Sequence, residues 1–129
     1  MFDTCKGATA CVRTRGPAAI TAFGARLASI IRQLRAAAPN AEIVVTGAWN
    51  PDPSHLEQLR PVYRALDEAI LRASGPSHAR VARMVPVFNP SVEPRARLCA
   101  LTFICSQGDP HPTDAGYRAM ADAMQRAMR

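Results

Sequence analysis

The chain has 129 residues, of which 48% are hydrophobic and 20% are charged, with a formal net charge of +6 and a pI of about 9.9. This length predicts one domain over residues 1–129, and the composition excludes a disordered chain, which would hold fewer apolar residues. No transmembrane segment is expected.

The first half of the chain predicts a helix, a strand and a second helix. Pro17 opens the first helix, which ends before Pro39. Its apolar face, at helical spacing, consists of Ile20, Phe23, Leu27, Ile30, Ile31 and Leu34. Residues 42–48 then form a buried strand. The second helix begins near Leu56 and ends at Gly75-Pro76, because this pair breaks a helix.

The second half predicts a strand, a long loop and a final helix. Residues 80–88 form the strand, which Pro86 interrupts. Thr113 is a good N-cap for the final helix, and Asp114 complements the helix dipole in the first turn. The apolar residues of this helix at helical spacing are Tyr117, Met120, Ala121, Met124 and Met128.

Alternation of helices and strands predicts a parallel sheet covered by helices on both faces, a three-layer α/β/α architecture. Two strands are too few to cover helices of this length, so we expect an incomplete sheet. The strand at 42–48 would then present Ile43, Val44 and Val45 at an open edge. Such an edge invites pairing with another chain, and a homodimer through it is one expectation.

Asp109 and His111 are the residues that most resemble catalytic chemistry. Each precedes a proline, which biases both toward extended conformation. Residues i and i+2 of an extended segment point the same way, so a carboxylate would lie beside an imidazole. An acid that orients a histidine in this way makes His111 a candidate general base. The alternative is that His111 only helps to cap the final helix.

The run from Asp109 to Tyr117 resembles the last block of the SGNH (GDSL) hydrolases, which are esterases and lipases. Residues 99–105, residues 39–47 and Asn50-Pro51 are similar to a secreted bacterial branch of that family. The resemblance implies a flavodoxin-like fold with a five-stranded sheet, in which the two strands here would be the last two. It also implies that Asp109 and His111 belong to a Ser-His-Asp triad. The family usually places the acid three residues before the histidine, whereas here the separation is two.

The serine block of that family is absent from this sequence. The six serines are Ser29, Ser54, Ser74, Ser77, Ser91 and Ser106, and none follows Gly-Asp or lies in a Gly-x-Ser-x-Gly context. None of Asn40, Asn50 and Asn89 matches the oxyanion asparagine of the family. Residues 1–5 resemble the stretch that follows the third block of the family.

The resemblance therefore implies the C-terminal part of a carboxylic ester hydrolase, inactive by itself, whose N-terminal strands and serine lie upstream. Its substrate would be an ester of a lipid, a sugar or a small alcohol, and no cofactor or metal is expected. The alternative is a binding or interaction module without catalysis, which dimerises through the open sheet edge.

Four cysteines occur as two pairs, Cys5 with Cys11 and Cys99 with Cys105, and each pair encloses five residues. Local disulfides are one interpretation, and a zinc site that includes His111 is the other. The spacing is wider than in structural zinc knuckles, and the family resemblance favours disulfides. Disulfides imply a secreted, extracellular or cell-envelope protein. The first 15 residues contain no apolar core of a signal peptide, so we expect that signal to lie outside this sequence.

Fifteen arginines and one lysine make the chain basic, but they are spread along it. With only seven Phe, Trp and Tyr residues, no stacking platform emerges, and no specific nucleic-acid partner is expected. His55 and His78 lie in turns at the two ends of the second helix and are expected to be surface residues. Trp49 and Asn50 follow the first strand, where they either line a substrate cleft or simply cover the strand end.

Overall fold

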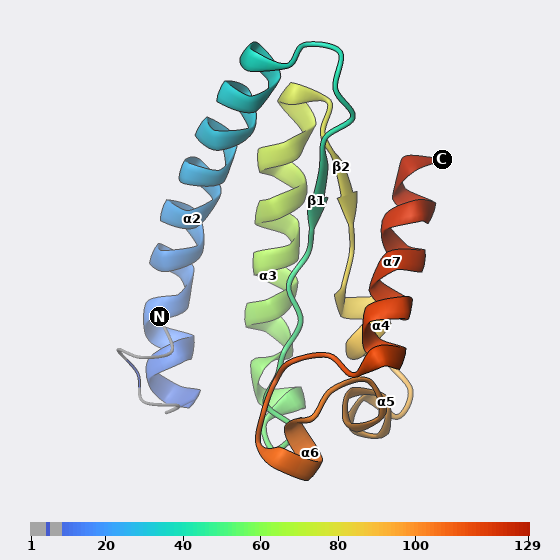
Figure 1. The fold of residues 1–129 in the computed structure, drawn as a ribbon. Helices are drawn as coiled ribbons and strands as arrows, with labels where there is room; N and C mark the ends of the chain where they lie inside the picture. Colours follow the sequence, from blue (N-terminus) through green and yellow to red (C-terminus); the bar gives the residue numbers. More distant parts are fainter. Residues whose placement is uncertain (1–4, 6–8) are drawn as a thin grey trace.

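The computed structural model describes Cys5 and residues 9–129. Residues 1–4, which carry most of the resemblance at the start of the chain, lie outside the described part. Two parallel strands, β1 (Val44–Thr46) and β2 (Arg80–Ala82), pair in the register Val44 with Arg80 to Thr46 with Ala82. Helix α3 (Leu56–Ser74) and helix α7 (Asp114–Met128) lie on opposite sides of this pair (Figure 1). The predicted order of helices around a small parallel sheet is confirmed.

Helix α2 (Thr9–Ala37) packs along α3. The prediction that Pro17 opens this helix is wrong, because Pro17 lies inside it. A proline removes one backbone hydrogen bond from a helix interior and costs about 3 kcal/mol. Packing on α3 offsets this cost, since Val12, in the turns before the proline, is buried in a cluster with Cys5, Leu59 and Tyr63.

The strand expected at 80–88 is also shorter than predicted. It ends at Ala82, and Val85–Phe88 instead form the short helix α4. Pro86 lies in the first turn of α4, where no helical hydrogen bond uses the missing N–H, whereas in a strand it would remove a ladder bond. The Met84 carbonyl accepts from the amides of Val87 and Phe88, at 3.0 Å each. A 3₁₀ turn, η1 (Gly75–Ser77), joins α3 to β2.

The loop predicted before the last helix contains two further helices, α5 (Pro94–Leu101) and α6 (Ile104–Gln107). Leu98 and Leu101 of α5 join Ala82, Phe88 and Ala123 in the main core. The last helix begins as predicted, with Thr113 as its N-cap. Tyr117, however, is 55% exposed, because α7 packs through smaller neighbouring residues such as Gly116 and Ala123.

The expected open edge of β1 is present, since β1 pairs only with β2 in the part of the chain described. Helix α2 likewise leaves large apolar side chains uncovered: Phe23 is 42% exposed, Ile30 53% and Leu34 51%. These three residues belong to the apolar face that the sequence predicts for this helix. The hydrophobic effect favours covering such a face, so α2 has a surface suited to further polypeptide.

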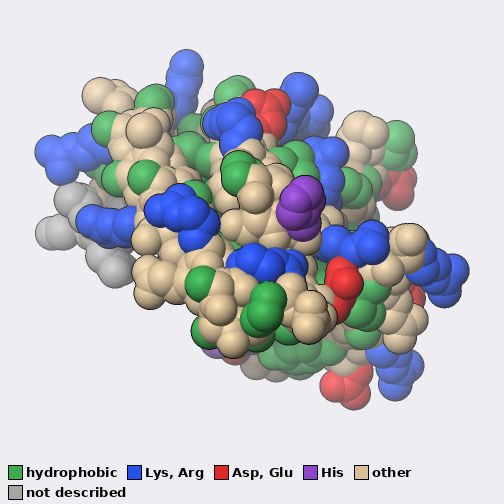
Figure 2. All heavy atoms as spheres, turned by 90° about the horizontal axis from the view of Figure 1, so that it is seen from above, with side chains coloured by type: hydrophobic (Ala, Val, Ile, Leu, Met, Phe, Trp, Pro, Cys, Tyr) green, Lys and Arg blue, Asp and Glu red, His purple; other side chains and the backbone are tan. Residues whose placement is uncertain are grey.

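Both strands run toward the same end of the molecule, where α3 and α7 begin and where α4, α5 and α6 gather (Figure 1). Loops at the carboxyl ends of parallel strands are the usual place for ligands in open α/β sheets. Figure 2 views the molecule from its other end and shows Lys and Arg side chains in several separate places rather than one patch. No described helix is long and apolar enough to cross a membrane.

Candidate functional site

Asp109 and His111 form the contact that the sequence predicts. Asp109 Oδ1 lies 2.5 Å from His111 Nδ1 and also accepts the backbone N–H of His111 at 2.9 Å. The His111 side chain is 74% exposed and that of Asp109 42%. A neutral imidazole that donates from Nδ1 to this carboxylate has Nε2 as its acceptor.

Backbone hydrogen bonds hold the His111 segment against the end of α5. The amide of Phe103 donates to the His111 carbonyl at 3.1 Å, and the amide of Thr113 donates to the Leu101 carbonyl at 2.9 Å. These two bonds form a short antiparallel bridge between Thr102 and Pro112. The histidine is therefore fixed at its backbone on both sides, although its ring faces solvent.

The start of α7 completes this support. The amide of Gly116 donates to the Thr113 hydroxyl at 3.2 Å, which is the cap that the sequence predicts. Gly116 also lies so close to α5 that an added Cβ would be 2.1 Å from the Leu101 carbonyl oxygen. Only glycine permits this approach, and the approach sets where α7 and the His111 segment meet α5.

The cysteines pair locally, Cys5 with Cys11 and Cys99 with Cys105, and no described cysteine is free. The second disulfide joins α5 to α6 and spans Phe103, whose amide holds His111. Within residues 9–129 and Cys5, no group of three or more His, Cys, Asp or Glu side chains is placed to hold a metal ion. The disulfide interpretation of the cysteine spacing is thus the one that the structure supports.

Replacing both Cys99 and Cys105 by serine is expected to lower the free energy of unfolding by about 2 kcal/mol, the chain-entropy value for so short a loop. Urea unfolding measures this change. Hydrogen exchange at the Phe103 and Thr113 amides is expected to accelerate, because the disulfide steadies the segment that pairs with residues 111–113. The double serine variant of Cys5 and Cys11 is the control and should leave both amides protected. Unchanged exchange in the first variant would contradict this supporting role.

Hydrogen bonds from His111 lower the pKa of the Asp109 carboxyl below its ordinary value of 3.8. The backbone N–H has the larger effect and the imidazole the next. Because the folded-state pKa is lowered, this interaction stabilises the protein above the unfolded-state pKa, and the stabilisation is lost as the pH falls through the folded-state pKa. Asp109 is therefore a carboxylate throughout the neutral range, as an orienting acid must be.

A carboxyl ¹³C titration tests this geometry. We expect a midpoint below 3.8 for Asp109 in the native protein. In His111→Ala the midpoint should rise but remain lowered, because the backbone N–H of residue 111 still donates. Asp52, whose carboxyl pKa is also lowered, is the internal control and should not change. A native Asp109 midpoint at or above 3.8 would contradict the hydrogen bonds described here.

A second acid and histidine pair lies at the start of α3, and sequence reasoning missed it. His55 Nδ1 is 2.8 Å from Asp52 Oδ2, and the amide of Ser54 donates to the other carboxylate oxygen at 2.9 Å. Burial of the Asp52 carboxyl opposes ionisation, but the hydrogen bonds from His55 and Ser54 outweigh it and lower the pKa. The sequence signal that could have revealed this pair is that Asp52 stands three residues before His55, where a helix begins. His78 is exposed, as expected.

Trp49 and Asn50 have different surroundings after the end of β1. Trp49 stacks on Phe88 of α4, with ring centroids 4.4 Å apart, and so covers the strand end. Asn50 is buried and lines a pocket beside α3. Asn50 therefore lines a pocket, as the cleft interpretation requires, whereas the covering interpretation holds for Trp49.

A family model described as the GDSL-like Lipase/Acylhydrolase family matches residues 6–119 of the chain. The chain belongs to this family. The GDSL-like fold is α/β, which agrees with the parallel strands and flanking helices, and membership supports hydrolase function in general. No curated protein and no solved structure matches the chain.

For a GDSL-like chain, the serines are the residues to account for. Ser74 and Ser77 are buried, and the Ser74 hydroxyl donates to the Ile70 carbonyl. Ser106 donates to Phe103, and Ser29 accepts from Gln33 within α2. Across residues 9–129, no serine hydroxyl is hydrogen-bonded to a histidine ring. In this part of the chain, the Asp109 and His111 pair therefore has no serine hydroxyl bonded to it.

Proposed function

We propose that this chain supplies the base and the acid of a carboxylic ester hydrolase that acts through a Ser-His-Asp triad. The observation that carries the proposal is the contact between Asp109 Oδ1 and His111 Nδ1 at 2.5 Å, which leaves Nε2 free to accept a proton. In this scheme Asp109 orients the ring and stabilises the imidazolium that forms. The exposure of the His111 ring supports the proposal, because a nucleophile must reach Nε2.

The reaction proceeds in two balanced steps. His111 Nε2 takes the proton of a serine hydroxyl while the serine oxygen bonds to the ester carbonyl carbon, and the same proton then passes to the departing alkoxide. Water repeats the sequence on the acyl-enzyme, which releases the carboxylic acid and restores the serine. The substrate class is an ester of a lipid, a sugar or a small alcohol.

The proposal places the nucleophilic serine on polypeptide outside this sequence. The unpaired edge of β1 and the uncovered apolar face of α2 support this, because further polypeptide could cover both. A segment that adds a strand to β1 and covers Phe23, Ile30 and Leu34 would satisfy both. Its loops at the carboxyl end of the new strand would then lie at the end of the sheet where His111 is found. The two disulfides further support export from the cytoplasm.

The test is fluorophosphonate labelling of the native protein purified from its source, with the intact mass and the labelled peptide both determined. We expect a mass above 13.9 kDa, hydrolysis of 4-nitrophenyl acetate, and label on a serine outside the present sequence. Label on one of the six serines present here would overturn the placement of the nucleophile. A native protein that neither takes the label nor hydrolyses esters would overturn the hydrolase proposal.

The open β1 edge also favours a second candidate function, that of an interaction module that dimerises through this edge. A native 13.9 kDa chain that forms a stable dimer, with a fold and a dimer that both survive His111→Ala, would favour the module. Sedimentation equilibrium of the native protein separates the two candidates, because the hydrolase proposal needs no second copy.

A further inference from the structure

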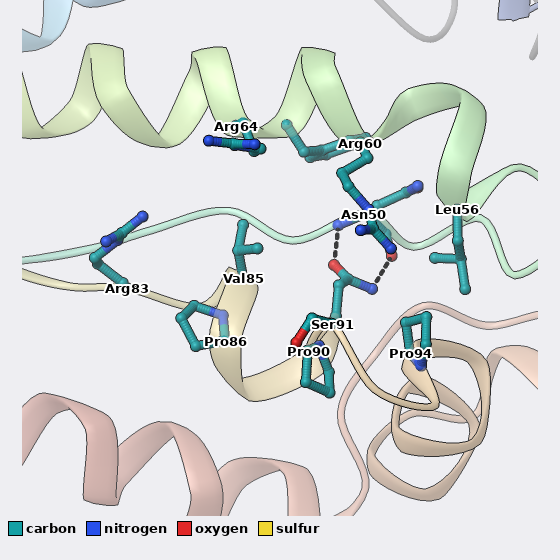
Figure 3. A pocket seen from close by; sticks show the side chains of 12 residues that line it. Asn50, Leu56, Arg60, Arg64, Arg83, Val85, Pro86, Pro90, Ser91 and Pro94 are labelled. Carbon is teal, nitrogen blue, oxygen red and sulfur yellow. Dashed lines mark hydrogen bonds between the residues drawn. The ribbon is translucent and has the colours of Figure 1, made fainter.

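A pocket of about 420 Å³ lies between α3 and the segment that follows β2 (Figure 3). It is at the end of the sheet where both strands finish, since Asn50 follows β1 and Arg83 follows β2. Its volume falls within the range of small-molecule sites. A larger pocket, of about 600 Å³, lies between α2 and α3 and includes no residue that follows a strand.

Three arginines line this pocket and no acidic residue does. Arg83 is held by the buried carboxylate of Asp67, with Nη2 2.6 Å and Nε 2.7 Å from Oδ2, and Arg60 pairs with Glu57. Arg64 has no carboxylate partner among the described residues. The pocket therefore carries a positive charge that its own surroundings leave unpaired, on a guanidinium suited to bind carboxylate or phosphate.

Asn50 supplies a second, independent indication of a ligand. Asn50 is only 2% exposed, and its side-chain Nδ2 has no hydrogen-bond partner in the part of the chain described. The side chain of Asn89 holds the Asn50 backbone. Its Oδ1 accepts from the Asn50 N–H at 2.7 Å, and its Nδ2 donates to the Asn50 carbonyl at 3.1 Å. A buried donor without a partner is costly, and a rotation of the side chain toward the pocket would let an anionic oxygen satisfy it.

Much of the remaining wall is apolar and comes from both sides of the pocket. Leu56 lies at the start of α3, Val85 and Pro86 belong to α4, Pro90 follows α4, and Pro94 begins α5 (Figure 3). Proline rings give rigid apolar surface that needs little ordering when a ligand binds. The pocket thus combines a hydrocarbon-lined space with donors for one anionic group.

We propose that this pocket binds an organic anion that has a short hydrocarbon body and a single carboxylate or phosphate group. Arg64 and Asn50 Nδ2 bind the anionic oxygens, and the proline and leucine side chains pack on the hydrocarbon. If the anion is part of the substrate, the proposal rests on the proposed hydrolase function. The ester substrate would then carry an anionic group away from the ester bond. Binding itself needs no turnover and is tested separately.

The test is a ¹⁵N NMR titration of the protein with hexanoate, hexyl phosphate, hexanol and inorganic phosphate. We expect saturable shifts at Asn50 and Arg64 with hexanoate or hexyl phosphate, and whichever binds more tightly identifies the anionic group. Hexanol should bind at least about tenfold more weakly, since it lacks the charge-assisted bonds. Inorganic phosphate should also bind more weakly, because it lacks the hydrocarbon body. Equal binding of hexanol, or of inorganic phosphate, would overturn the proposal.

Variants locate the site. Arg64→Gln is expected to weaken binding of the preferred anion about tenfold, the usual effect of one charge-assisted hydrogen bond. The exposed position of Arg64 makes loss of folding unexpected. Arg26→Gln on α2 removes the same charge away from the pocket and should leave binding unchanged. Asn50→Asp keeps the size of the side chain but adds a negative charge, and its repulsion of the anion should abolish binding. If Arg64→Gln and Arg26→Gln weaken binding equally, the effect is one of net charge and the proposed site is wrong.

Discussion

The largest expected effect is on ester hydrolysis: His111→Ala should lower the kcat of the native protein by about 10³-fold. General acid-base catalysis by a positioned side chain contributes 10²- to 10⁴-fold, and His111 is the proposed group for both proton transfers. Because the ring is mostly exposed and the His111 backbone carbonyl keeps its bond to the Phe103 amide, the variant should fold normally. Initial rates with 4-nitrophenyl esters measure the loss, and thermal unfolding verifies the fold.

His55→Ala is the matched control for this experiment, because it removes the imidazole of the other acid and histidine pair. It should leave kcat within a few-fold of the native value. Asp109→Asn should reduce kcat as well, since an amide no longer holds the required tautomer, while KM changes little. The opposite pattern, with activity lost in His55→Ala and kept in His111→Ala, would assign the base to the pair at α3.

The largest effect on stability is expected at Gly116. In Gly116→Ala the new Cβ would lie 2.1 Å from the Leu101 carbonyl oxygen and 2.8 Å from Pro112 Cβ. Backbone atoms cannot rotate away as a side chain does, so α7 must move off α5. We expect a loss of about 3 kcal/mol in the free energy of unfolding and a melting temperature lower by about 10 °C or more.

Gly75→Ala is the control for Gly116→Ala. Gly75 has helical backbone angles, φ −54° and ψ −52°, and an added Cβ would meet nothing within 4 Å. This variant should be as stable as the native protein, or more stable by up to about 1 kcal/mol, because alanine restricts the unfolded chain. Equal melting temperatures for the two variants would show that the close approach at Gly116 does not hold α7 in place.

Much of the candidate site was predictable because its chemistry is local in sequence. Asp109 and His111 are two residues apart, so the prolines and the extended backbone are enough to predict their contact. The same holds for Cys99 with Cys105 and for the Thr113 cap. Asp52 and His55 are equally local, but their contact depends on how the chain turns into α3, which the pattern of apolar residues does not predict.

Fold prediction was less accurate at Pro17 and Pro86, although the helices before Pro39 and at Gly75-Pro76 end as predicted. By its strong local preferences, proline predicts the start of the first helix at Pro17 and an interruption of the second strand at Pro86. In the structure, packing of Val12 against α3 extends α2 through Pro17, and Pro86 opens α4. Local preference is worth a few kcal/mol at most, and burial of several apolar side chains exceeds it.

By itself, the sequence predicted the alternation of helices and strands and the contact between Asp109 and His111, because each depends on neighbours within a few residues. It offered local cysteine pairs as one interpretation beside a zinc site, and the structure supports the pairs. Only the tertiary structure decided that Gly116 approaches Leu101 and that Arg64, Asn50 and the prolines after β2 share one pocket. These groups lie up to 44 positions apart, between Asn50 and Pro94. Their meeting depends on how α3, the strands and α5 pack, and that packing is a property of the whole chain.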